Sequence, residues 1–323
     1  MISNKKIAVV VPAHNEADHI AEVIRSMPSF VDHIVIVDDY SSDQTVNIVT
    51  SMQASDAGDR CIILRHTYNQ GVGAAIATGY RWANEHQVPV TTVMAGDGQM
   101  DPAELAHIIA PVVDGQAEYV KGNRLIYADV WNVMPKYRFL GNSFLSLLTK
   151  IASGYWKMVD SQTGYTAISL QTLQRIDLKA LYPSYGFPND LLVKLNVINA
   201  RVVEIPIRPI YAGQKSGIRL SSVIPRISWL LLRGFVWRLW VKYVVRDFHP
   251  LVFFYSFGIL FFSIGSLFGL YLVVYRLAAG PVSTTSALFA SLFFISGLQS
   301  LFFAMWFDME DNKELFIKRD DRR

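Results

Sequence analysis

The chain has 323 residues, of which 51% are hydrophobic and 18% are charged, and its formal net charge at pH 7 is +3. A net charge this small gives no argument for nucleic acid as a partner. The single cysteine, Cys61, excludes an intramolecular disulfide bond and gives only a weak hint of a reducing compartment. The first apolar run, Ile7–Val11, is far too short to be a secretory signal.

The first part of the chain alternates between short apolar runs and segments with helical spacing. Strands are predicted at Ile7–Val11, His33–Asp38, Cys61–Arg65, Thr91–Ala95 and Tyr119–Gly122. Helices are predicted at Ala17–Met27, through Val46 and Ile48, and from Ala74 to Trp82. This repeated alternation of strand and helix predicts an α/β fold, built on a mostly parallel sheet with right-handed crossovers.

Four polar stretches follow consecutive strands, and we expect them to converge on one edge of the sheet. They are Pro12–Glu16, Asp38–Asp43, the loop at Asn69, and Asp97–Gln99. Open α/β sheets bind their ligands at the carboxyl ends of the strands. Acidic groups that meet there repel one another unless a cation or hydrogen-bond donors lie between them. Any one aspartate alone is also explained as a turn or helix cap.

The stretch Thr91–Pro102 carries the sharpest signal. A β-branched, apolar strand ends at a Gly-Asp-Gly turn around Asp97, and the chain restarts as a helix at Pro102 with Asp101 as its N-cap. Asp97 and Gln99 offer hard oxygen ligands, which suit Mg²⁺ or Mn²⁺. We therefore expect Asp97 to hold a divalent cation.

The pattern is less regular from residue 125 to residue 219. Helices are predicted at Phe139–Ile151 and Asp190–Ile198, and a strand is predicted at Ala200–Ile207. The segment Ser221–Asp247 is basic and rich in tryptophan. In one series Arg219, Arg226 and Arg233 recur every seven residues, and in another Arg238, Lys242 and Arg246 recur every four. The two series do not share a helical face. We expect two short amphipathic helices, bent near Gly234, in the interface of a lipid bilayer. An ordinary packed pair of helices is the alternative.

Two long uncharged runs follow, Leu251–Val274 with 24 residues and Pro281–Phe307 with 27. A membrane-spanning helix needs about 20 apolar residues, so two spans joined by Tyr275–Pro281 are predicted. Basic residues gather before the first run and after the second, while the connecting loop has only Arg276. The positive-inside rule therefore places both termini on the cytoplasmic side of the cell membrane. A helical hairpin inside a soluble protein is the weaker alternative.

Five motifs occur in order and at suitable spacing. They are Pro12-Ala-His-Asn-Glu16, Val37-Asp-Asp-Tyr-Ser-Ser-Asp43, Asn69-Gln-Gly-Val-Gly-Ala-Ala75, Ala95-Gly-Asp-Gly-Gln99 and Lys121-Gly-Asn-Arg124. In these motifs the chain resembles family-2 inverting glycosyltransferases with the GT-A fold, over residues 5–220. It is most similar to the subgroup of dolichyl-phosphate mannosyltransferases and bacterial polyprenyl-phosphate glycosyltransferases. We expect a GT-A domain at 1–220, amphipathic juxtamembrane helices at 221–249, and a two-helix transmembrane hairpin with a short cytoplasmic tail at 250–323.

The resemblance also implies roles for individual residues. Positions that hold the nucleotide sugar are matched by Pro12, Ala13, Asn15, Glu16, Asp39, Asp97 and Lys215, the last lying with Ser216 in a loop that closes on the donor in relatives. Metal ligands are matched by Asp97 and Gln99, with Mg²⁺ or Mn²⁺ as the cofactor. Positions near the diphosphate and the acceptor phosphate are matched by Arg124, Arg138 and Ser143. Asp160 and Gln162 match a further motif, and the expected catalytic set is Asp97, Arg124, Arg138 and Asp160. The chain departs from the family at Ala95, which replaces the first acid of the Asp-x-Asp motif and removes one metal contact.

The function that this resemblance implies is transfer of a sugar from a UDP- or GDP-linked donor to a polyprenyl monophosphate of undecaprenyl or dolichyl type, with inversion. Two alternatives stay open. A processive polysaccharide synthase is disfavoured, because its Gln-x-x-Arg-Trp motif is missing and two spans are few for a polymer channel. A catalytically inactive nucleotide-sugar-binding membrane protein is disfavoured by the intact Asp39, Asp97, Arg124 and Arg138. The sugar and the base stay open, and a homo-oligomer is compatible with the sequence.

Overall fold

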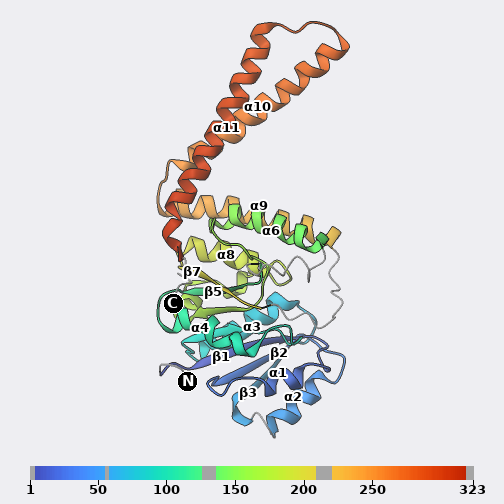
Figure 1. The fold of residues 1–323 in the computed structure, drawn as a ribbon, viewed down its shortest axis with the longest axis vertical. Coiled ribbons are helices and arrows are strands. Elements are labelled where there is room, and N and C mark those ends of the chain that lie inside the picture. The colour runs from blue at the N-terminus through green and yellow to red at the C-terminus, as the bar shows by residue number, and fades with distance from the viewer. Residues whose placement is uncertain (1–3, 55–57, 126–135, 209–219, 318–323) are drawn as a thin grey trace. The chain divides into compact units, whose positions relative to one another are not determined.

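The computed structural model describes residues 4–54, 58–125, 136–208 and 220–317 (Figure 1). The chain forms two compact units. One unit comprises residues 1–235 together with 314–323, and the other comprises residues 236–313. The predicted divisions after residues 220 and 249 were based on composition. The compact units instead divide the chain after residue 235, inside a helix, and the segment from residue 314 onward belongs to the first unit.

The first unit is built on a sheet with the strand order β3-β2-β1-β4-β6-β5-β7-β8. The strands are β1 (Ile7–Ala13), β2 (His33–Asp38), β3 (Cys61–Arg65), β4 (Val90–Val93), β5 (Tyr119–Asn123), β6 (Thr166–Ser169), β7 (Val202–Pro206) and β8 (Phe316–Ile317). Only the pairings of β6, with β4 and with β5, are antiparallel. The prediction of an α/β domain on a mostly parallel sheet is confirmed.

Helices cover both faces of this sheet (Figure 1). They are α1 (Ile20–Arg25), α2 (Thr45–Ala54), α3 (Val72–Glu85), α4 (Leu105–Val113), α7 (Leu170–Arg175) and α8 (Phe187–Val197). Helix α6 (Lys136–Ser153) packs on α8 instead. The 3-10 turns are η1 (Gly58–Arg60), η2 (Pro102–Glu104), η3 (Leu178–Ala180) and η5 (Lys313–Leu315). Alternate residues of β1 point to opposite faces. Val9 packs in a core with Ile20 of α1 and Ile108 of α4, and Val10 packs in a second core with Tyr80 of α3 and Leu191 of α8.

The fourth strand ends at Val93 rather than at the predicted Ala95. Its backbone nevertheless stays beside β1, because the Met94 N–H donates to the Val10 carbonyl at 3.0 Å and the Gly96 N–H donates to the Pro12 carbonyl at 3.3 Å. The turn after β4 is thus fixed against the end of β1. This contact brings two of the predicted polar stretches together.

The expected bend at Gly234 is wrong. Helix α9 (Leu220–Trp240) runs through this glycine, and the helical path changes only beyond Trp240, where η4 (Val241–Arg246) is a π-helix. A glycine costs a helix interior about 1 kcal/mol relative to alanine. The helix is stabilised by packing of Ile227 and Leu231 against Val193 of α8 and against α6, which outweighs this small penalty.

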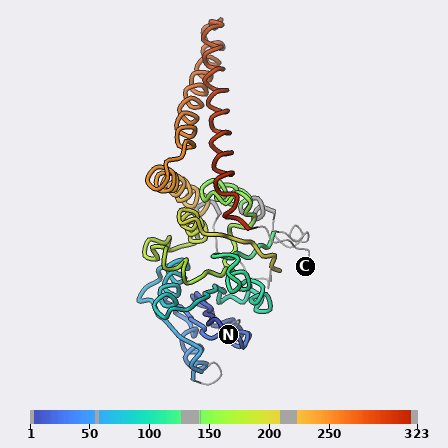
Figure 2. The backbone as a smooth tube through the Cα atoms, turned by 90° about the vertical axis from the view of Figure 1, so that its left-hand side faces the viewer, coloured from blue at the N-terminus to red at the C-terminus, as the bar shows by residue number. Residues whose placement is uncertain are grey.

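The second unit contains α10 (Leu251–Ala278) and α11 (Thr284–Asp311), which Figure 2 shows running side by side. Both helices are long and apolar enough to cross a membrane, and only 11% and 17% of their most apolar stretches are buried. That exposure argues against the core hairpin of a soluble protein, whose apolar surface would be covered.

The basic residues of Ser221–Asp247 do not all lie on an exposed face. Arg226 and Arg233 are exposed, as expected for an interfacial helix. Arg238 and Lys242, in contrast, are buried within the second unit, where Arg238 makes a two-point ion pair with Asp308. The expectation that these two side chains face the bilayer interface is therefore wrong, because their charges are neutralised by acids at the end of α11.

Candidate active site

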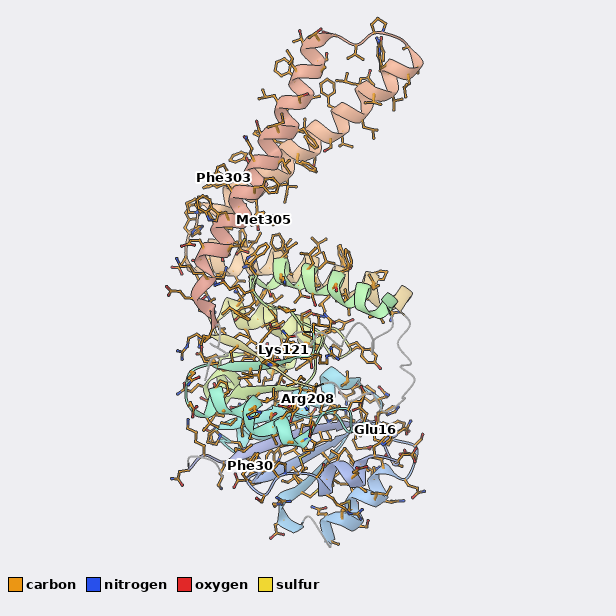
Figure 3. The ribbon with its side chains drawn as sticks, viewed as in Figure 1. Glu16, Phe30, Lys121, Arg208, Phe303 and Met305 are labelled. Atoms are coloured by element: carbon orange, nitrogen blue, oxygen red, sulfur yellow. The ribbon has the colours of Figure 1, made fainter. Side chains whose placement is uncertain are left out.

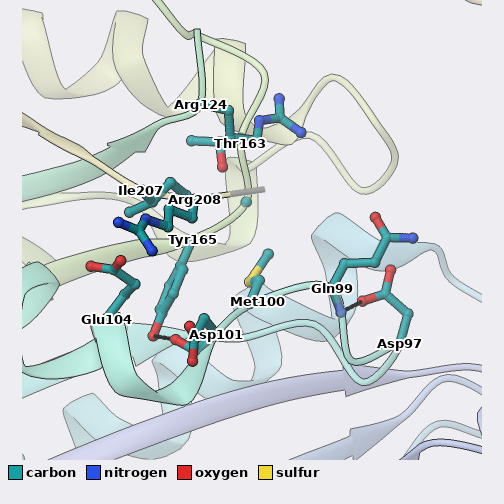
Figure 4. A pocket seen from close by; sticks show the side chains of 11 residues that line it. Asp97, Gln99, Met100, Asp101, Glu104, Arg124, Thr163, Tyr165, Ile207 and Arg208 are labelled. Carbon is teal, nitrogen blue, oxygen red and sulfur yellow. Dashed lines mark hydrogen bonds between the residues drawn. The ribbon is translucent and has the colours of Figure 1, made fainter. Parts of the chain in front are cut away.

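A pocket lies where the chain leaves β4, β5 and β7 and where it enters β6 (Figure 4). Its lining residues are Asp97, Gln99, Met100, Asp101, Glu104, Arg124, Thr163, Gly164, Tyr165, Ile207 and Arg208. Parallel strands that end at one edge of a sheet bring their following loops together there. The pocket thus unites Asp97 and Gln99, which the strand pattern placed at the sheet edge, with Arg124, which the family resemblance placed near the diphosphate. It adds the side chains of Glu104, Thr163, Tyr165 and Arg208.

Asp97 is held by its own turn. Its Oδ1 accepts a hydrogen bond from the Gln99 N–H at 3.0 Å, and Gly98 supplies the positive φ of 72° that the turn requires. Figure 4 shows the side chains of Asp97 and Gln99 next to one another at one end of the pocket. The predicted N-cap is also present, since Asp101 accepts from the Ala103 N–H at 2.9 Å.

The electrostatics of this end of the pocket suit a cation. Burial, followed by the negative charges of Asp97 and Asp43, raises the pKa of Glu16 against the opposing effect of His19 and His14. A carboxyl group whose ionisation is opposed by a neighbouring carboxylate would be relieved by a bound positive charge. Among the described residues, no group of three or more His, Cys, Asp or Glu side chains forms a metal cluster. Asp97 and Gln99 fit a site that leaves other coordination positions to a ligand.

The predicted nucleotide-binding residues after β1 lie beside the turn after β2. The Asn15 N–H donates to Ser41 Oγ at 2.9 Å, and Asn15 Oδ1 accepts from the Ser42 N–H at 2.8 Å. The Glu16 N–H donates to Thr45 Oγ1 at 2.9 Å. Pro12 and Ala13 are the last residues of β1. These contacts fix the two turns as one surface at the sheet edge.

Asp39 connects three loops at the same edge. Its carboxylate accepts from the Gln70 N–H at 2.8 Å, from the Gly71 N–H at 2.7 Å, and pairs with His66 Nδ1 at 2.8 Å. Its own N–H donates to the Ala13 carbonyl at 2.8 Å. Asp39 therefore fixes the loops that form the predicted nucleotide-binding surface. Its direct contact with a nucleotide stays a prediction. Sequence reasoning missed His66. Its position directly after β3 was the available signal, because polar residues of the predicted site also follow β1, β2 and β4.

The Arg124 side chain lines the pocket and is held in place by Asp160. Asp160 Oδ2 accepts from Arg124 Nε at 2.8 Å, and Asp160 Oδ1 accepts from Arg124 Nη2 at 3.2 Å. The Asp160 side chain is only 1% exposed, whereas 24% of the Arg124 side chain is exposed. Burial alone would raise the pKa of Asp160, but the charge and hydrogen bonds of Arg124, together with the charge of Lys121, outweigh it and lower that pKa. Asp160 is thus an ionised support behind Arg124, not a wall of the pocket.

The remaining predicted residues are less closely placed. Arg138 and Ser143 both lie in α6, where Ser143 is partly exposed and the Arg138 side chain is outside what the structure describes. Gln162 donates from Nε2 to Asn189 Oδ1 of α8 at 2.9 Å. Lys215 and Ser216 lie outside the described residues. The roles of Arg138 and Ser143 at the acceptor phosphate, and of Lys215 and Ser216 in closure on the donor, remain predictions.

Two characterised proteins are similar to this chain in sequence. The N-acetylglucosaminyltransferase of Methanococcus voltae that uses UDP-N-acetylglucosamine and dolichyl phosphate is 29% identical over 65% of this chain and 88% of its own length. The polyprenol monophosphomannose synthase of Mycolicibacterium smegmatis is 26% identical over 71% of this chain and 88% of its own.

A solved structure shares the fold alone. Glucosyl-3-phosphoglycerate synthase from Mycobacterium tuberculosis, in complex with Mn²⁺, uridine diphosphate and phosphoglyceric acid, has a TM-score of 0.54 at 16% identity, covering 73% of this chain and 79% of that one. The family model described as glycosyl transferase family 2 matches residues 8–176, just over half of the chain. The resemblance seen in the five motifs is thereby confirmed, and the chain belongs to glycosyl transferase family 2.

Proposed function

We propose that this glycosyltransferase moves a sugar from a nucleoside diphosphate sugar to a polyprenyl monophosphate, and that it inverts the anomeric configuration. One observation carries the proposal: a single pocket holds the oxygen pair of Asp97 and Gln99 at one end and the supported guanidinium of Arg124 in its wall. This arrangement suits two anionic groups that must be held close together. Relatives that act on dolichyl phosphate or make polyprenol monophosphomannose support the lipid acceptor.

The chemistry follows from the charges of the two substrates. An oxygen of the lipid phosphate attacks the anomeric carbon, and the bond from that carbon to the diphosphate oxygen breaks as a nucleoside diphosphate leaves. The attacking phosphate is already an anion, so no strong general base is needed. Arg124, a residue type suited to phosphate, holds the acceptor phosphate or the diphosphate. Asp160 holds the Arg124 guanidinium in orientation through two hydrogen bonds.

A divalent cation completes the proposed site. Asp97 and Gln99 would hold Mg²⁺ or Mn²⁺, which when bound neutralises charge that grows on the leaving diphosphate. The Mn²⁺ and uridine diphosphate in the solved complex of similar fold are consistent with this assignment. The nucleoside of the donor is proposed to be uridine or guanosine, bound beside the turns that contain Asn15, Glu16 and Asp39.

The proposed acceptor is a membrane lipid, and the structure offers apolar surface for a bilayer. Along α9 the exposed large hydrophobic side chains lie on one face at helical spacing, and they are Trp229, Leu232, Val236, Trp237 and Trp240. Residues 221–249 are proposed to lie in the interface and 250–311 to cross the membrane, with the catalytic domain and both termini on the cytoplasmic side.

Product analysis tests the proposal. The purified full chain is incubated with a panel of UDP- and GDP-linked sugars, with Mg²⁺ or Mn²⁺, and with a polyprenyl phosphate, and the lipid is analysed by mass spectrometry. We expect one hexose-sized mass increment on the lipid for one donor, and no increment with EDTA. A polymeric product would favour a processive synthase. Donor binding without any modified lipid would contradict the proposed transfer.

A further inference from the structure

Glu204 of β7 lies outside the pocket but holds the segment that carries Asp160. Both of its carboxylate oxygens accept from the Val159 N–H at 2.9 Å, and Oε1 also accepts from the Asp160 N–H at 2.8 Å. Backbone N–H groups outside regular secondary structure need acceptors from side chains or water, and here Glu204 supplies the acceptor. The three bonds fix the backbone from which the Asp160 side chain reaches Arg124.

The same carboxylate also holds the other side of Arg124. Glu204 Oε2 accepts from Asn123 Nδ2 at 3.0 Å, and Asn123 Oδ1 accepts from the Leu125 N–H at 2.9 Å. Asn123 and Leu125 flank Arg124 in the chain. One carboxylate therefore ties both the segment 123–125 and the segment 159–160, and the ion pair between Arg124 and Asp160 joins these two segments at the pocket.

Sheet geometry explains why Glu204 can reach both segments. Strands β5 and β7 are parallel neighbours, with Lys121 opposite Glu204 and Asn123 opposite Pro206. Asp160 itself accepts from the Arg124 N–H at 3.2 Å, so the guanidinium and its own backbone are held by one acid. Lys121 Nζ donates to the Thr163 carbonyl, which fixes the far end of the Asp160 loop.

We infer that Glu204 is a positioning residue for the transfer reaction, because it sets Arg124 in the pocket through Asp160 and Asn123. The test that measures turnover rests on the proposed function, and the test that measures the reactivity of Arg124 does not. The physical content of the inference is that loss of the Glu204 carboxylate frees the Arg124 guanidinium from its fixed orientation. Positioned charges act in catalysis because they need no reorganisation at the moment of reaction.

The chain offers a matched control for a purely structural role. Glu118, beside the opposite end of β5, accepts from the Arg201 N–H at 2.6 Å and pairs with Arg175 at 3.4 Å. It is therefore a second carboxylate that joins the β5 and β7 regions through a backbone N–H, and it does not line the pocket. Glu118→Gln should lower the melting temperature without disturbing Arg124.

The first test does not depend on turnover. Phenylglyoxal modifies arginine, and peptide mass spectrometry gives the rate at Arg124 in the full chain. We expect Glu204→Gln to speed this modification several-fold. The glutamine NH₂ group replaces one carboxylate oxygen and cannot accept, so the variant loses either the bond from Asn123 Nδ2 to Oε2 or the bonds from the Val159 and Asp160 N–H groups to Oε1. Glu118→Gln is expected to leave the rate unchanged. Equal rates at Arg124 in the wild type and Glu204→Gln would overturn the inference, whatever the enzyme is found to transfer.

The second test asks whether Glu204 acts through Asp160. With polyprenyl phosphate as the varied substrate, we expect Glu204→Gln to lower kcat/KM by about tenfold or more, and to change it less than about twofold in an Asp160→Asn background. Additive effects of the two substitutions would contradict the inference. If Glu204→Gln does not fold, Asn123→Ala removes one of the ties, and it should give a smaller change in the same two measurements.

Discussion

Asp97 combines a structural and a chemical task in one side chain. Its Oδ1 stabilises the turn through the Gln99 N–H, and its charge is the feature that suits a cation. Asparagine at this position retains an oxygen for the turn but loses the charge. We expect Asp97→Asn to fold normally and to lower turnover by about 10²-fold or more, because it weakens stabilisation of the leaving diphosphate.

A matched control is available at Asp177, whose Oδ1 accepts from the Lys179 N–H at 3.0 Å in the same two-residue arrangement. Asp177 does not line the pocket. Asp177→Asn should therefore leave turnover of the lipid phosphate unchanged when both variants are assayed in membranes. Near wild-type turnover in Asp97→Asn would refute the assignment of Asp97 to the metal.

Lys121 makes the stability of the protein depend on alkaline pH. The side chain, labelled in Figure 3, is fully buried, and burial lowers its pKa from 10.5 to about 8 although Asp160 and Glu204 favour the charged form. Between these two values the unfolded chain holds the proton and the folded protein does not. The contribution of Lys121 to the free energy of unfolding therefore rises with pH across this range.

Lys121→Met removes this titration. We expect the difference in free energy of unfolding, wild type minus variant, to rise by on the order of 3 kcal/mol from pH 8 to pH 10.5. Urea denaturation in detergent at a series of pH values measures it. Parallel curves for wild type and Lys121→Met would show that Lys121 does not titrate there.

The sequence predicted several pocket residues and, through the family resemblance, Asp160, but it did not predict the supporting role of Asp160 or any role for Glu204. Asp97 and Gln99 lie in the turn after the strand predicted at Thr91–Ala95, whereas Arg124 was identified through the family motif Lys121-Gly-Asn-Arg124. Asp160 and Glu204 acquire their partners only through pairing of β5, β6 and β7, which join residues far apart in the chain. No local sequence pattern predicts that the Glu204 carboxylate accepts a hydrogen bond from the Val159 N–H. Burial and partner identity are properties of the fold, not of the motif.

At the scale of elements, the end of α9 and the π-helix that follows it carry a buried charged cluster. Arg238 pairs with both Asp308 oxygens at 2.8 and 2.9 Å, Lys242 donates to Asn312 Oδ1 at 2.7 Å, and Tyr243 donates to Asp308 Oδ1 at 2.8 Å. Each of these residues is nearly or fully buried. Such a cluster depends on all its members, because removing one leaves an uncompensated charge.

Arg238→Met should therefore destabilise the second unit by about 3–5 kcal/mol. The double variant Arg238→Met/Asp308→Leu should recover most of this loss, since no charge remains unpaired. Arg233→Met, five residues earlier on the exposed side of α9, should change stability by less than about 0.5 kcal/mol. Thermal and urea unfolding in detergent measure these changes. A mild effect of Arg238→Met alone would mean that water reaches Asp308.

Strand predictions succeeded where the sequence carries an uninterrupted apolar run. The limits of β2 and β3 agree with the predicted His33–Asp38 and Cys61–Arg65. The strands β6 and β8 were missed, because four and two residues are too short to show a period. The bend predicted at Gly234 failed for a related reason: tertiary packing on α8 decides the path of α9, and a single glycine does not.

For the molecule as a whole, β8 constrains how the chain can cross a membrane. Strand β7 precedes both apolar helices and β8 follows both, and Phe316 and Ile317 pair with Val202 and Val203. The segments before α10 and after α11 must therefore share one side of any membrane that the two helices cross. This conclusion is independent of the charge distribution.

Cysteine labelling in intact cells tests this arrangement. In a background of Cys61→Ala, we expect Ala279→Cys, in the connection between the helices, to react with a membrane-impermeant maleimide. Lys313→Cys, after α11, should react only when the membrane is permeabilised, as the positive-inside rule predicts. The reverse pattern would invert the proposed orientation. Equal labelling of both positions would contradict two spans.

The return of the chain to β8 makes the helical hairpin an insertion in the catalytic domain rather than an appendage at its end. During synthesis, β8 emerges only after both apolar helices, so the sheet is completed last. An enzyme built in this order finishes its catalytic sheet after its anchor has left the ribosome. A soluble form should therefore not stop before the helices. It should replace residues 236–313 with a flexible linker, which keeps Phe316 and Ile317 available to close the edge of β7.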